Sequence, residues 1–286
     1  MKKILVIGKT GQLASAMAEI ITDEDQWIFL GRDELDLFKT ESILGKLRNF
    51  KFDYLINCAA YTAVDEAEDN SELAFKVNTE ALGPISMACS EQDAILIHIS
   101  TDYVFGSGHT TPLKEDENKS PEGVYGKTKL QGEETIQAIS KKHIIIRTSW
   151  LYGETGHNFL NTMLKLSETK KELSVVFDQV GSPTYVAELA EAIQNIIQSR
   201  KEDFGIYHYS NEGVCSWFDF AHSIFALSNK EVNLVPVLSD AFPTKAKRPN
   251  YSVMDKQKIR DTFDLVIPHW RDSLIKCLTK KNILND

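Results

Sequence analysis

Short apolar runs recur along the first half of the chain, and a longer amphipathic or polar stretch follows each of them. The pattern predicts strands at residues 3–7, 27–30, 52–57, 94–99 and 143–147, separated by helical or capped segments. Strands that alternate with helices form parallel pairs, because each helix returns the chain to the same end of the sheet. The sequence therefore predicts an α/β fold built on a doubly wound parallel sheet.

The pattern changes beyond about residue 150. A helix is predicted to open at Asn158 and Phe159, a strand to cover 173–177, a helix 185–197 and a strand 204–209. We expect these elements to form a smaller α/β lobe. Residues 1–150 are then the larger domain, completed by return segments from the C-terminal half, and residues 151–286 are mainly the lobe.

Length and composition indicate a cytoplasmic protein. A chain of 286 residues can bury a full α/β core, and no apolar run approaches a membrane span. The first residues lead into a strand instead of a signal peptide. The net charge of −9 argues against nucleic acid as a partner. The four cysteines, Cys58, Cys89, Cys215 and Cys277, show no CxxC and no clustering with histidine, so we expect buried free thiols and no metal site.

A glycine turn follows the first predicted strand directly. The segment runs from Gly8 through Gly11 to Ala14, where a helix begins. Backbone N–H groups and the positive end of a helix can approach a pyrophosphate closely in such a turn. The Gly-Lys-Thr triplet also occurs in P-loops, but that motif requires a glycine where Lys3 stands. We therefore predict a dinucleotide site and exclude a P-loop.

Arg32 follows the second predicted strand, in the place where dinucleotide-binding sheets select their cofactor. An acidic residue there suits a free ribose hydroxyl, whereas an arginine suits the additional phosphate of NADP. Arg32 favours NADPH, while Asp33 and Asp36 are near enough in sequence to bind a ribose hydroxyl and leave NADH open.

The third and fourth predicted strands end in segments suited to a binding site. Small residues at 57–62 would allow the backbone to lie against a cofactor, and a tightly packed strand end explains them nearly as well. Ligands of such sheets bind beyond the carboxyl ends of the strands. The hydroxyl of Thr101, at the end of the fourth strand, is thus a candidate for chemistry.

Tyr125 and Lys129 are four residues apart on a predicted helix, which places a phenol and an ammonium on one face. A cation near the phenol should lower its pKa and allow it to transfer a proton at a carbonyl or alcohol oxygen. The same spacing is common on solvated helix faces, so it gains meaning only with Thr101 and the glycine turn. We interpret the preceding loop, with Pro112 and Pro121, as a surface loop and not as a lid.

Several segments together resemble a known family. The run Ser100 to Phe105 with Tyr125 and Lys129 resembles the core of the extended short-chain dehydrogenase/reductases, which have Rossmann-type sheets. Within that superfamily the chain resembles the dTDP-4-dehydrorhamnose reductase family, from the first strand to about residue 275. The segments that carry this second resemblance are 8–13, 59–65, 147–150, 178–184 and 248–252.

The resemblance implies roles for individual residues. It assigns the pyrophosphate to Gly8, Gly11, Gln12 and Leu13, and the adenosine to Arg32, Asp36 and Leu37. It assigns the nicotinamide-side ribose to Ala60, Tyr61, Thr62 and Lys129, and it places Tyr125 among the cofactor-binding residues as well. It assigns proton transfer to Tyr125 with Thr101 and Lys129. It assigns a dTDP-linked 4-keto-6-deoxysugar to Thr101, Asp102, Tyr103, Trp150, Asn158 and Arg248. Trp150 is equally well explained as a core aromatic.

The implied reaction is reduction of the sugar's C4 keto group by NADPH or NADH, within dTDP-rhamnose biosynthesis. Two alternatives stay open: a nucleotide-sugar epimerase or dehydratase of the same superfamily, and a non-catalytic regulatory subunit resembling the partner of methionine adenosyltransferase. Some family members dimerise around magnesium held by a glutamate of the first helix, where this chain has Ser15, Ala16 and Met17. We therefore predict no magnesium bridge, and leave monomer and homodimer open.

Lys245, Lys247 and Arg248 form a basic cluster in an otherwise acidic chain. Such a cluster suits the diphosphate of a nucleotide sugar, although a solvated charge run is its commoner explanation. The resemblance favours the binding role for Arg248 alone.

Overall fold

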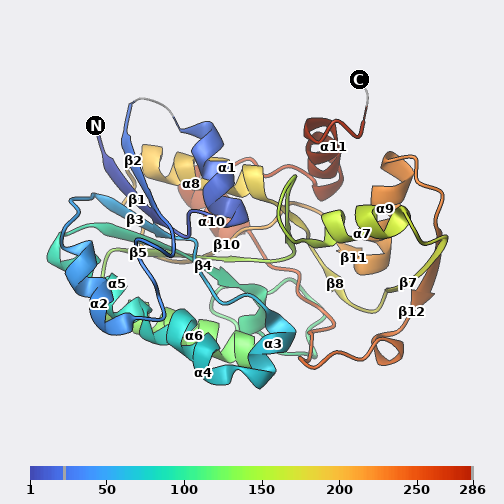
Figure 1. Ribbon diagram of the computed structural model, residues 1–286, viewed down its shortest axis with the longest axis horizontal. Coiled ribbons are helices and arrows are strands. Elements are labelled where there is room, and N and C mark those ends of the chain that lie inside the picture. The colour runs from blue at the N-terminus through green and yellow to red at the C-terminus, as the bar shows by residue number, and fades with distance from the viewer. Residues whose placement is uncertain (22–23, 285–286) are drawn as a thin grey trace.

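The computed structural model describes residues 1–21 and 24–284 (Figure 1). Its centre is a six-stranded sheet in the order β2-β1-β3-β4-β5-β10, with every pair parallel. The strands are β1 (Lys3–Ile7), β2 (Gln26–Leu30), β3 (Tyr54–Asn57), β4 (Ile95–Thr101), β5 (His143–Thr148) and β10 (Gly205–His208). The order reverses direction beside β1, as in a doubly wound fold. The predicted fold class is confirmed.

Helices cover both faces of this sheet (Figure 1). One face carries α1 (Gln12–Ile20), α8 (Val186–Ser199) and α10 (Gln257–Phe263), and the other carries α2 (Thr40–Leu47), α5 (Leu82–Glu91) and α6 (Val124–Ile139). Alternate residues of β1 enter different cores: Ile4 and Val6 pack on the first face, whereas Leu5 and Ile7 pack on the second. A strand buried on both faces needs apolar residues at every position, which explains its continuous apolar run.

Two elements that we expected in the smaller lobe belong to the central layers. Strand β10 extends the sheet by pairing with β5, with Gly205 opposite Ile144 and His208 opposite Arg147. Helix α8 packs against α1 on the sheet. The expectation for these two segments was wrong because a strand's sequence does not reveal its partner, and β10 pairs with a strand about sixty residues earlier in the chain.

The remaining C-terminal elements form a separate group at the right of Figure 1. Its helices are α7 (Phe159–Ser167), α9 (Trp217–Leu227) and α11 (Trp270–Lys280). Its short strands pair as β7 (Glu172–Val176) with β12 (Asn233–Val237), β8 (Val180–Gly181) with β11 (Cys215–Ser216), and β6 (Leu151–Tyr152) with β9 (Thr184–Tyr185). The strand predicted at 173–177 is confirmed by β7.

Small helical segments connect these layers. They are α3 (Val64–Asp69), α4 (Ser71–Phe75), the π-helix η1 (Lys76–Glu80) and the 3₁₀ turns η2 (Asp102–Val104) and η3 (Ser239–Ala241). Across the described ranges, no helix is both long and apolar enough to cross a membrane. All four cysteines are free thiols; Cys89, Cys215 and Cys277 are buried, and Cys58 is half-buried.

Candidate active site

The carboxyl end of β4 and the first turns of α6 bring three predicted residues together. Thr101 ends β4, and its Oγ1 donates a hydrogen bond to Asp102 Oδ1 at 3.0 Å and accepts one from the Tyr103 backbone N–H at 3.2 Å. The ring of Tyr103 meets that of Tyr125 edge to face, with centroids 5.5 Å apart. The side chain of Thr101 is also near enough to the Tyr125 phenol to lower its pKa. The strand end and the helix thus place a hydroxyl beside the phenol.

Two glycines of α6 allow this close approach. A Cβ on Gly126 would lie 2.2 Å from the carbonyl oxygen of Tyr103, and one on Gly132 would lie 2.1 Å from that of Asn78. Real Cβ atoms do not come so close to backbone oxygens, so any side chain here would push α6 away from η2 or η1. Gly126 therefore helps to hold the phenol next to the end of β4.

The prediction of a lowered pKa for Tyr125 is wrong for this structure. Burial raises the pKa of Tyr125 to about 12, opposed by the side chain of Thr101 and assisted by the charge of Asp102. Lys129 does not offset the burial, because its Nζ points to the Ile99 carbonyl oxygen at 2.6 Å. The phenol accordingly keeps its proton throughout the physiological pH range.

Lys129 belongs to α6 and is fully buried between this helix and the sheet, and its surroundings include a residue that sequence reasoning missed. Its Nζ lies 3.0 Å from His98 Nε2, and His98 Nδ1 lies 3.1 Å from Asn57 Nδ2. Burial lowers the pKa of Lys129 to about 8, and the carboxylate of Glu133 opposes the shift. The signal in the sequence was a polar residue inside the apolar strand Ile95–Thr101.

A buried ion pair supports this part of α6. Arg147, on β5, donates from Nη2 to Glu133 Oε2 at 2.7 Å and from Nε to Glu133 Oε1 at 3.0 Å. The same carboxylate accepts from Ser100 Oγ at 2.5 Å, and the guanidinium also donates to the carbonyl oxygen of Glu115 at 3.1 Å. Arg147 lay in a family motif, but its partner Glu133 was not predicted.

The glycine turn has the geometry that a pyrophosphate requires. Gly8 has φ +97°, and a Cβ there would lie 2.9 Å from the backbone nitrogen of Ala59, so the position excludes other residues. Gly11 is the N-cap of α1, and no side chain from the described residues caps this helix end or adds an acid to its first turn. The first N–H groups of α1 are therefore suited to an anion. Leu13 is buried in the core behind them.

Asn158 connects the smaller lobe to this turn. Its Nδ2 donates to Gln12 Oε1 at 2.8 Å and to the Gly153 carbonyl oxygen at 3.1 Å. Its Oδ1 accepts from the backbone N–H of Asn161 and so caps α7. In this structure Asn158 thus orients Gln12 and the start of α7, a role that sequence reasoning did not predict.

The predicted adenosine residues lie after β2 and differ in exposure. The side chain of Arg32 is 73% exposed; its guanidinium lies 4.9 Å from the ring centre of Phe38, and its Nε lies 3.6 Å from Asp36 Oδ1. Leu37 is buried in the core on the α2 face. Arg32 and Asp36 can therefore present side chains to a ligand, whereas Leu37 contributes packing.

The loop at Ala60, Tyr61 and Thr62 is held in place by Asn78, another residue missed from the sequence. Asn78 Oδ1 accepts from the Tyr61 N–H at 2.8 Å, and its Nδ2 donates to the Tyr61 carbonyl oxygen at 3.1 Å. Asn78 is buried within η1, and such π-helical turns are frequent at functional sites. The loop after β3 is thereby fixed against α6.

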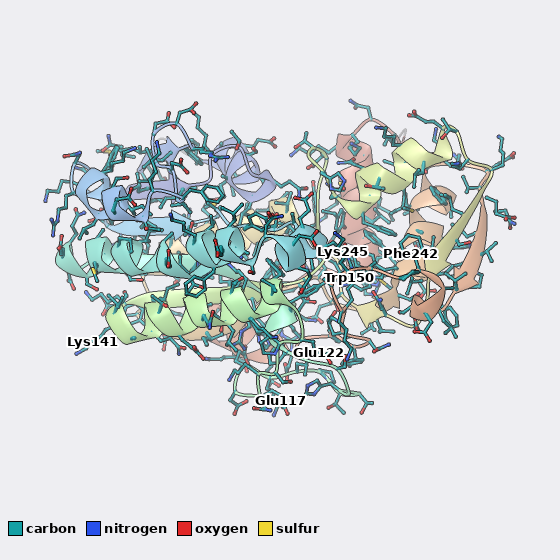
Figure 2. The ribbon with its side chains drawn as sticks, turned by 60° about the horizontal axis from the view of Figure 1, so that its bottom comes forward. Glu117, Glu122, Lys141, Trp150, Phe242 and Lys245 are labelled. Atoms are coloured by element: carbon teal, nitrogen blue, oxygen red, sulfur yellow. The ribbon has the colours of Figure 1, made fainter. Side chains whose placement is uncertain are left out.

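Trp150 lies at the junction between the two halves of the chain (Figure 2). Its backbone is left-handed, with φ +48°, and its indole stacks on Trp217 with ring centroids 3.5 Å apart and planes 9° apart. A Cβ on Gly181 would lie 2.8 Å from the same indole. The half-buried ring is therefore rigidly oriented, and Trp217 is a partner that the sequence did not reveal.

The basic cluster is engaged in ion pairs with the first half of the chain. Arg248 binds Asp65 through two hydrogen bonds of 2.6 and 3.2 Å. Lys247 Nζ lies 2.5 Å from Glu122 Oε1, and Lys245 pairs with Asp69. Asp65 and Asp69 belong to α3, so this loop fastens the C-terminal half to the larger domain. Only Arg248 has a partly buried side chain.

Asp102 has an oxygen without a hydrogen-bonding partner in the part of the chain that the structure describes. This Oδ2 atom is buried beside Thr101, and burial raises the pKa of Asp102 to about 6. A buried polar atom without a partner is costly, and a ligand hydroxyl can satisfy it. The position of Asp102 thus fits contact with a polar ligand.

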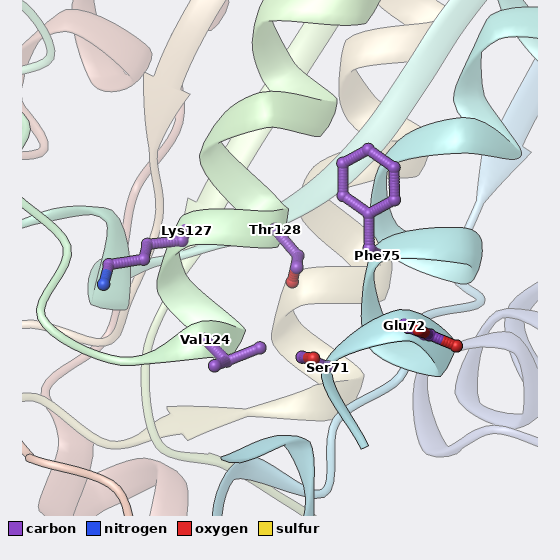
Figure 3. A pocket seen from close by; sticks show the side chains of 6 residues that line it. All are labelled: Ser71, Glu72, Phe75, Val124, Lys127 and Thr128. Carbon is purple, nitrogen blue, oxygen red and sulfur yellow. The ribbon is translucent and has the colours of Figure 1, made fainter. Parts of the chain in front are cut away.

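A shallow groove of about 300 Å³ lies outside this site (Figure 3). It is formed between α4 and α6 by Ser71, Glu72, Phe75, Val124, Lys127 and Thr128. None of the predicted catalytic or binding residues lines it. The groove is therefore separate from the predicted site at the end of β4.

Comparison with known proteins identifies the family. The model of the RmlD substrate binding domain matches residues 1–283. A dTDP-4-dehydrorhamnose reductase from Aggregatibacter actinomycetemcomitans is 36% identical, with 96% of this chain and 97% of the relative covered. The chain belongs to the dTDP-4-dehydrorhamnose reductase family. The family resemblance of the sequence motifs is confirmed.

Two further relatives are similar to nearly the whole chain. The spore coat polysaccharide biosynthesis protein SpsK of Bacillus subtilis is 38% identical, with 99% of both chains covered. The crystal structure of a dTDP-4-dehydrorhamnose reductase from Bacillus anthracis in complex with NADP is 36% identical, with a TM-score of 0.94 and coverage of 98% of this chain and 99% of that one. The similarity thus includes both the sheet and the smaller lobe.

The stretch for which we predicted no magnesium bridge lies within α1. Ala16 and Met17 are buried under α8, and Ser15 offers a hydroxyl and no carboxylate. Within residues 1–21 and 24–284, no group of three or more His, Cys, Asp and Glu side chains is arranged to hold a metal.

Proposed function

We propose that this protein reduces the C4 keto group of dTDP-4-dehydro-β-L-rhamnose and forms dTDP-L-rhamnose, with NADPH as the hydride donor and NADH as a second donor. The observation that carries the proposal is the grouping of Thr101, Tyr125 and Lys129 at the carboxyl end of β4, in a chain of the reductase family. Parallel sheets bind their ligands at this end. A 4-keto sugar presented there would meet a protonated phenol.

Each of the three residues has a separate task in the proposed reaction. The bound NADPH supplies a hydride to the C4 carbon. Tyr125 donates its phenolic proton to the carbonyl oxygen as negative charge develops on it, so the C=O bond becomes CH–OH. Thr101 orients the phenol and the carbonyl oxygen by hydrogen bonding. The Lys129 ammonium donates to the nicotinamide-side ribose and stabilises the phenolate that remains.

The pKa of Tyr125 suits an acid in this direction of reaction. A phenol with a pKa of about 12 stays protonated at neutral pH and releases its proton only to a strong base. The oxygen of a carbonyl that is receiving a hydride becomes such a base, because it turns into an alkoxide. Burial thus keeps Tyr125 protonated until hydride transfer makes the carbonyl oxygen basic enough to take the proton.

We propose that the cofactor lies across β1, β2 and β3. Gly8, Gly11, Gln12 and Leu13 would hold the pyrophosphate, supported by the tight turn at Gly8 and the uncapped start of α1. Arg32, with Asp36 and Leu37, would lie at the adenosine. Ala60, Tyr61 and Thr62 would line the nicotinamide-side ribose together with Lys129.

We propose that residues 1–150, with the returning α8 and β10, are the dinucleotide domain, and that residues 151–286 mainly form the substrate-binding lobe. The substrate would lie between them, where Thr101, Asp102, Tyr103, Trp150, Asn158 and Arg248 come from both parts of the chain. Arg248 now binds Asp65 of α3, so it would have to release this carboxylate in order to bind the diphosphate.

We propose that the protein is a cytoplasmic enzyme, and the state of its cysteines supports this location. Free thiols at all four cysteines are typical of a reducing compartment. We propose that the protein acts there as a monomer or homodimer, without nucleic acid or membrane as a partner.

One assay tests the proposed function. The purified protein is incubated with dTDP-4-dehydro-β-L-rhamnose and either NADPH or NADH, and both cofactor oxidation and the sugar product are measured. We expect stoichiometric oxidation and a single product, dTDP-L-rhamnose. An epimerase or dehydratase would convert the sugar without net oxidation, and a regulatory subunit would do neither; either result would refute the proposal.

Arg32→Ala is expected to raise the KM for NADPH about tenfold or more and to leave the KM for NADH unchanged. A charge-assisted hydrogen bond contributes about 1.5–3 kcal/mol, and only NADPH carries the phosphate that Arg32 would bind. Initial rates with each cofactor measure the effect. Arg48→Ala, which removes another exposed arginine of the larger domain, is the matched control. An equal rise in the KM values for NADPH and NADH would show that Arg32 does not recognise the additional phosphate of NADPH.

A further inference from the structure

A row of polar side chains is buried between the sheet and α6. Asn57 and His98 are opposite each other on β3 and β4, and Lys129 reaches them from the helix. All three are buried, with at most 1% exposure. Buried polar groups must match donors with acceptors, so the hydrogen positions in this row can be assigned from its contacts.

The amide of Asn57 has a fixed orientation. Its Oδ1 accepts a hydrogen bond from the backbone N–H of Ala59 at 3.1 Å. The backbone can only donate at this point, so the oxygen must face Ala59 and the Nδ2 hydrogens must face His98. The Nδ1 atom of His98, 3.1 Å from that Nδ2, is therefore an acceptor.

The acceptor on Nδ1 determines where His98 carries its hydrogen. Burial and the neighbouring Lys129 hold the pKa of His98 well below its ordinary value, so the ring is neutral. A neutral imidazole has one N–H, which must then be on Nε2. This N–H points to Lys129 Nζ at 3.0 Å.

A donor directed at Nζ has a consequence for the lysine. A neutral amine has a lone pair that can accept from Nε2–H, whereas an ammonium has only hydrogens and would meet another donor. We infer that His98, oriented by Asn57, is a positioning residue that presents an N–H to Lys129 and thereby opposes the ammonium form. Asn57 and His98 together set the upper limit of the pH range in which Lys129 is charged.

The other groups around Lys129 do not replace this effect. Ile99 offers a carbonyl oxygen that either form of the lysine can use. Glu133 favours the ammonium, but its carboxylate is shared with Arg147 and Ser100. Tyr125 is one turn away and stays protonated. Burial lowers the pKa of Lys129 to about 8, in the direction that the His98 donor also requires.

The catalytic consequence rests on the proposed function. If the ammonium holds the ribose and stabilises the phenolate, kcat/KM falls as the pH rises through the pKa of Lys129. Exchanging the His98 donor for an acceptor would favour the ammonium and move this alkaline limb to higher pH. The movement is upward because the charged form then persists over more of the alkaline range.

Two substitutions change the hydrogen pattern by different routes. In Asn57→Asp the carboxylate accepts from Nδ1, so Nε2 becomes an acceptor facing Lys129. In Asn57→Leu no donor faces Nδ1, so the ring can carry its hydrogen there and offer Nε2 as an acceptor to Nζ without an added charge. We expect both variants to shift the alkaline limb of kcat/KM upward by about one pH unit or more. Asn57→Asp alone would act partly through its charge, so the neutral variant is decisive.

Nitrogen NMR of the histidine side chains provides a readout that does not depend on activity. The His98 signals are assigned by their loss in His98→Gln. We expect the Nε2–H tautomer in the unchanged protein and the Nδ1–H tautomer in Asn57→Asp. An Nδ1–H tautomer in the unchanged protein, or an alkaline limb that stays in place in Asn57→Leu, would overturn the inference. Failure of the reductase assay with the expected tautomers would refute the proposed function alone.

Discussion

Tyr125→Phe is expected to lower kcat for reduction of the 4-keto sugar by about 10³-fold, because general acid catalysis contributes roughly 10²–10⁴-fold. The substitution removes only the phenolic oxygen and retains the ring that packs against Tyr103. The carbonyl oxygen must then take its proton from water, while Thr101 and Lys129 remain in place. Single-turnover rates with excess enzyme measure the loss at the chemical step.

Binding measurements separate chemistry from folding in this variant. The affinity for NADPH, measured by calorimetry, should change by less than about threefold, because the phenol is assigned to the carbonyl oxygen and Lys129 to the ribose. Tyr54→Phe removes another buried tyrosine hydroxyl, from β3 in the core, and is the matched control for rate. Turnover by Tyr125→Phe within a few-fold of the unchanged protein would eliminate Tyr125 as the acid.

The fold of the first half could be predicted from its sequence because the signal is local. Strands such as Ile4 to Ile7 are buried on two faces and have continuous apolar runs, and the turn at Gly8 follows from a backbone that no other residue adopts easily. The position of β10 was not predictable in this way. Its four residues look like any short strand, and only the pairing of Tyr207 with Ile146 assigns it to the central sheet.

The residues of the candidate site differ in the same way: some are indicated by local sequence, and others depend on contacts between distant segments. Thr101, Tyr125 and the glycine turn were predictable from spacing, since each lies where a strand ends or a helix begins. Their supports were not, because contacts across strands depend on register: Asn57 meets His98 only in the alignment that β3 and β4 adopt. The pKa of Tyr125 was mispredicted for a related reason. Sequence spacing indicated a nearby cation, but burial, which the sequence does not reveal, has the larger effect.

The basic cluster illustrates how charge patterns mislead without geometry. Lys245 and Lys247 were grouped with Arg248 by sequence, yet each pairs with a carboxylate of the first half. These exposed pairs contribute little to stability, about 0–1 kcal/mol each. Arg248 differs because its guanidinium is partly buried and its pair with Asp65 has two hydrogen bonds. The structure thus separates one arginine with a specific partner from two solvated lysines.

Glu133→Gln is expected to lower the free energy of unfolding by about 3–5 kcal/mol, because it leaves the buried guanidinium of Arg147 without its counter-charge. Both side chains are at most 1% exposed, so water cannot replace the lost carboxylate. Arg147→Met should cost a similar amount by leaving Glu133 unpaired. Urea unfolding measures both, and Arg48→Ala, which breaks the exposed pair with Glu91, should change stability by less than about 1 kcal/mol.

The double variant Glu133→Gln with Arg147→Met tests whether the lost stability comes from an unpaired buried charge. If the cost of each single change is an uncompensated buried charge, removing both charges should restore much of the stability, and the double variant should exceed either single variant. Additive losses would instead show that shape or the bonds to Ser100 and Glu115 dominate. Because Glu133 is one turn beyond Lys129, the restored variant should still show altered activity, since the helix face that orients the lysine has lost its anchor on β5.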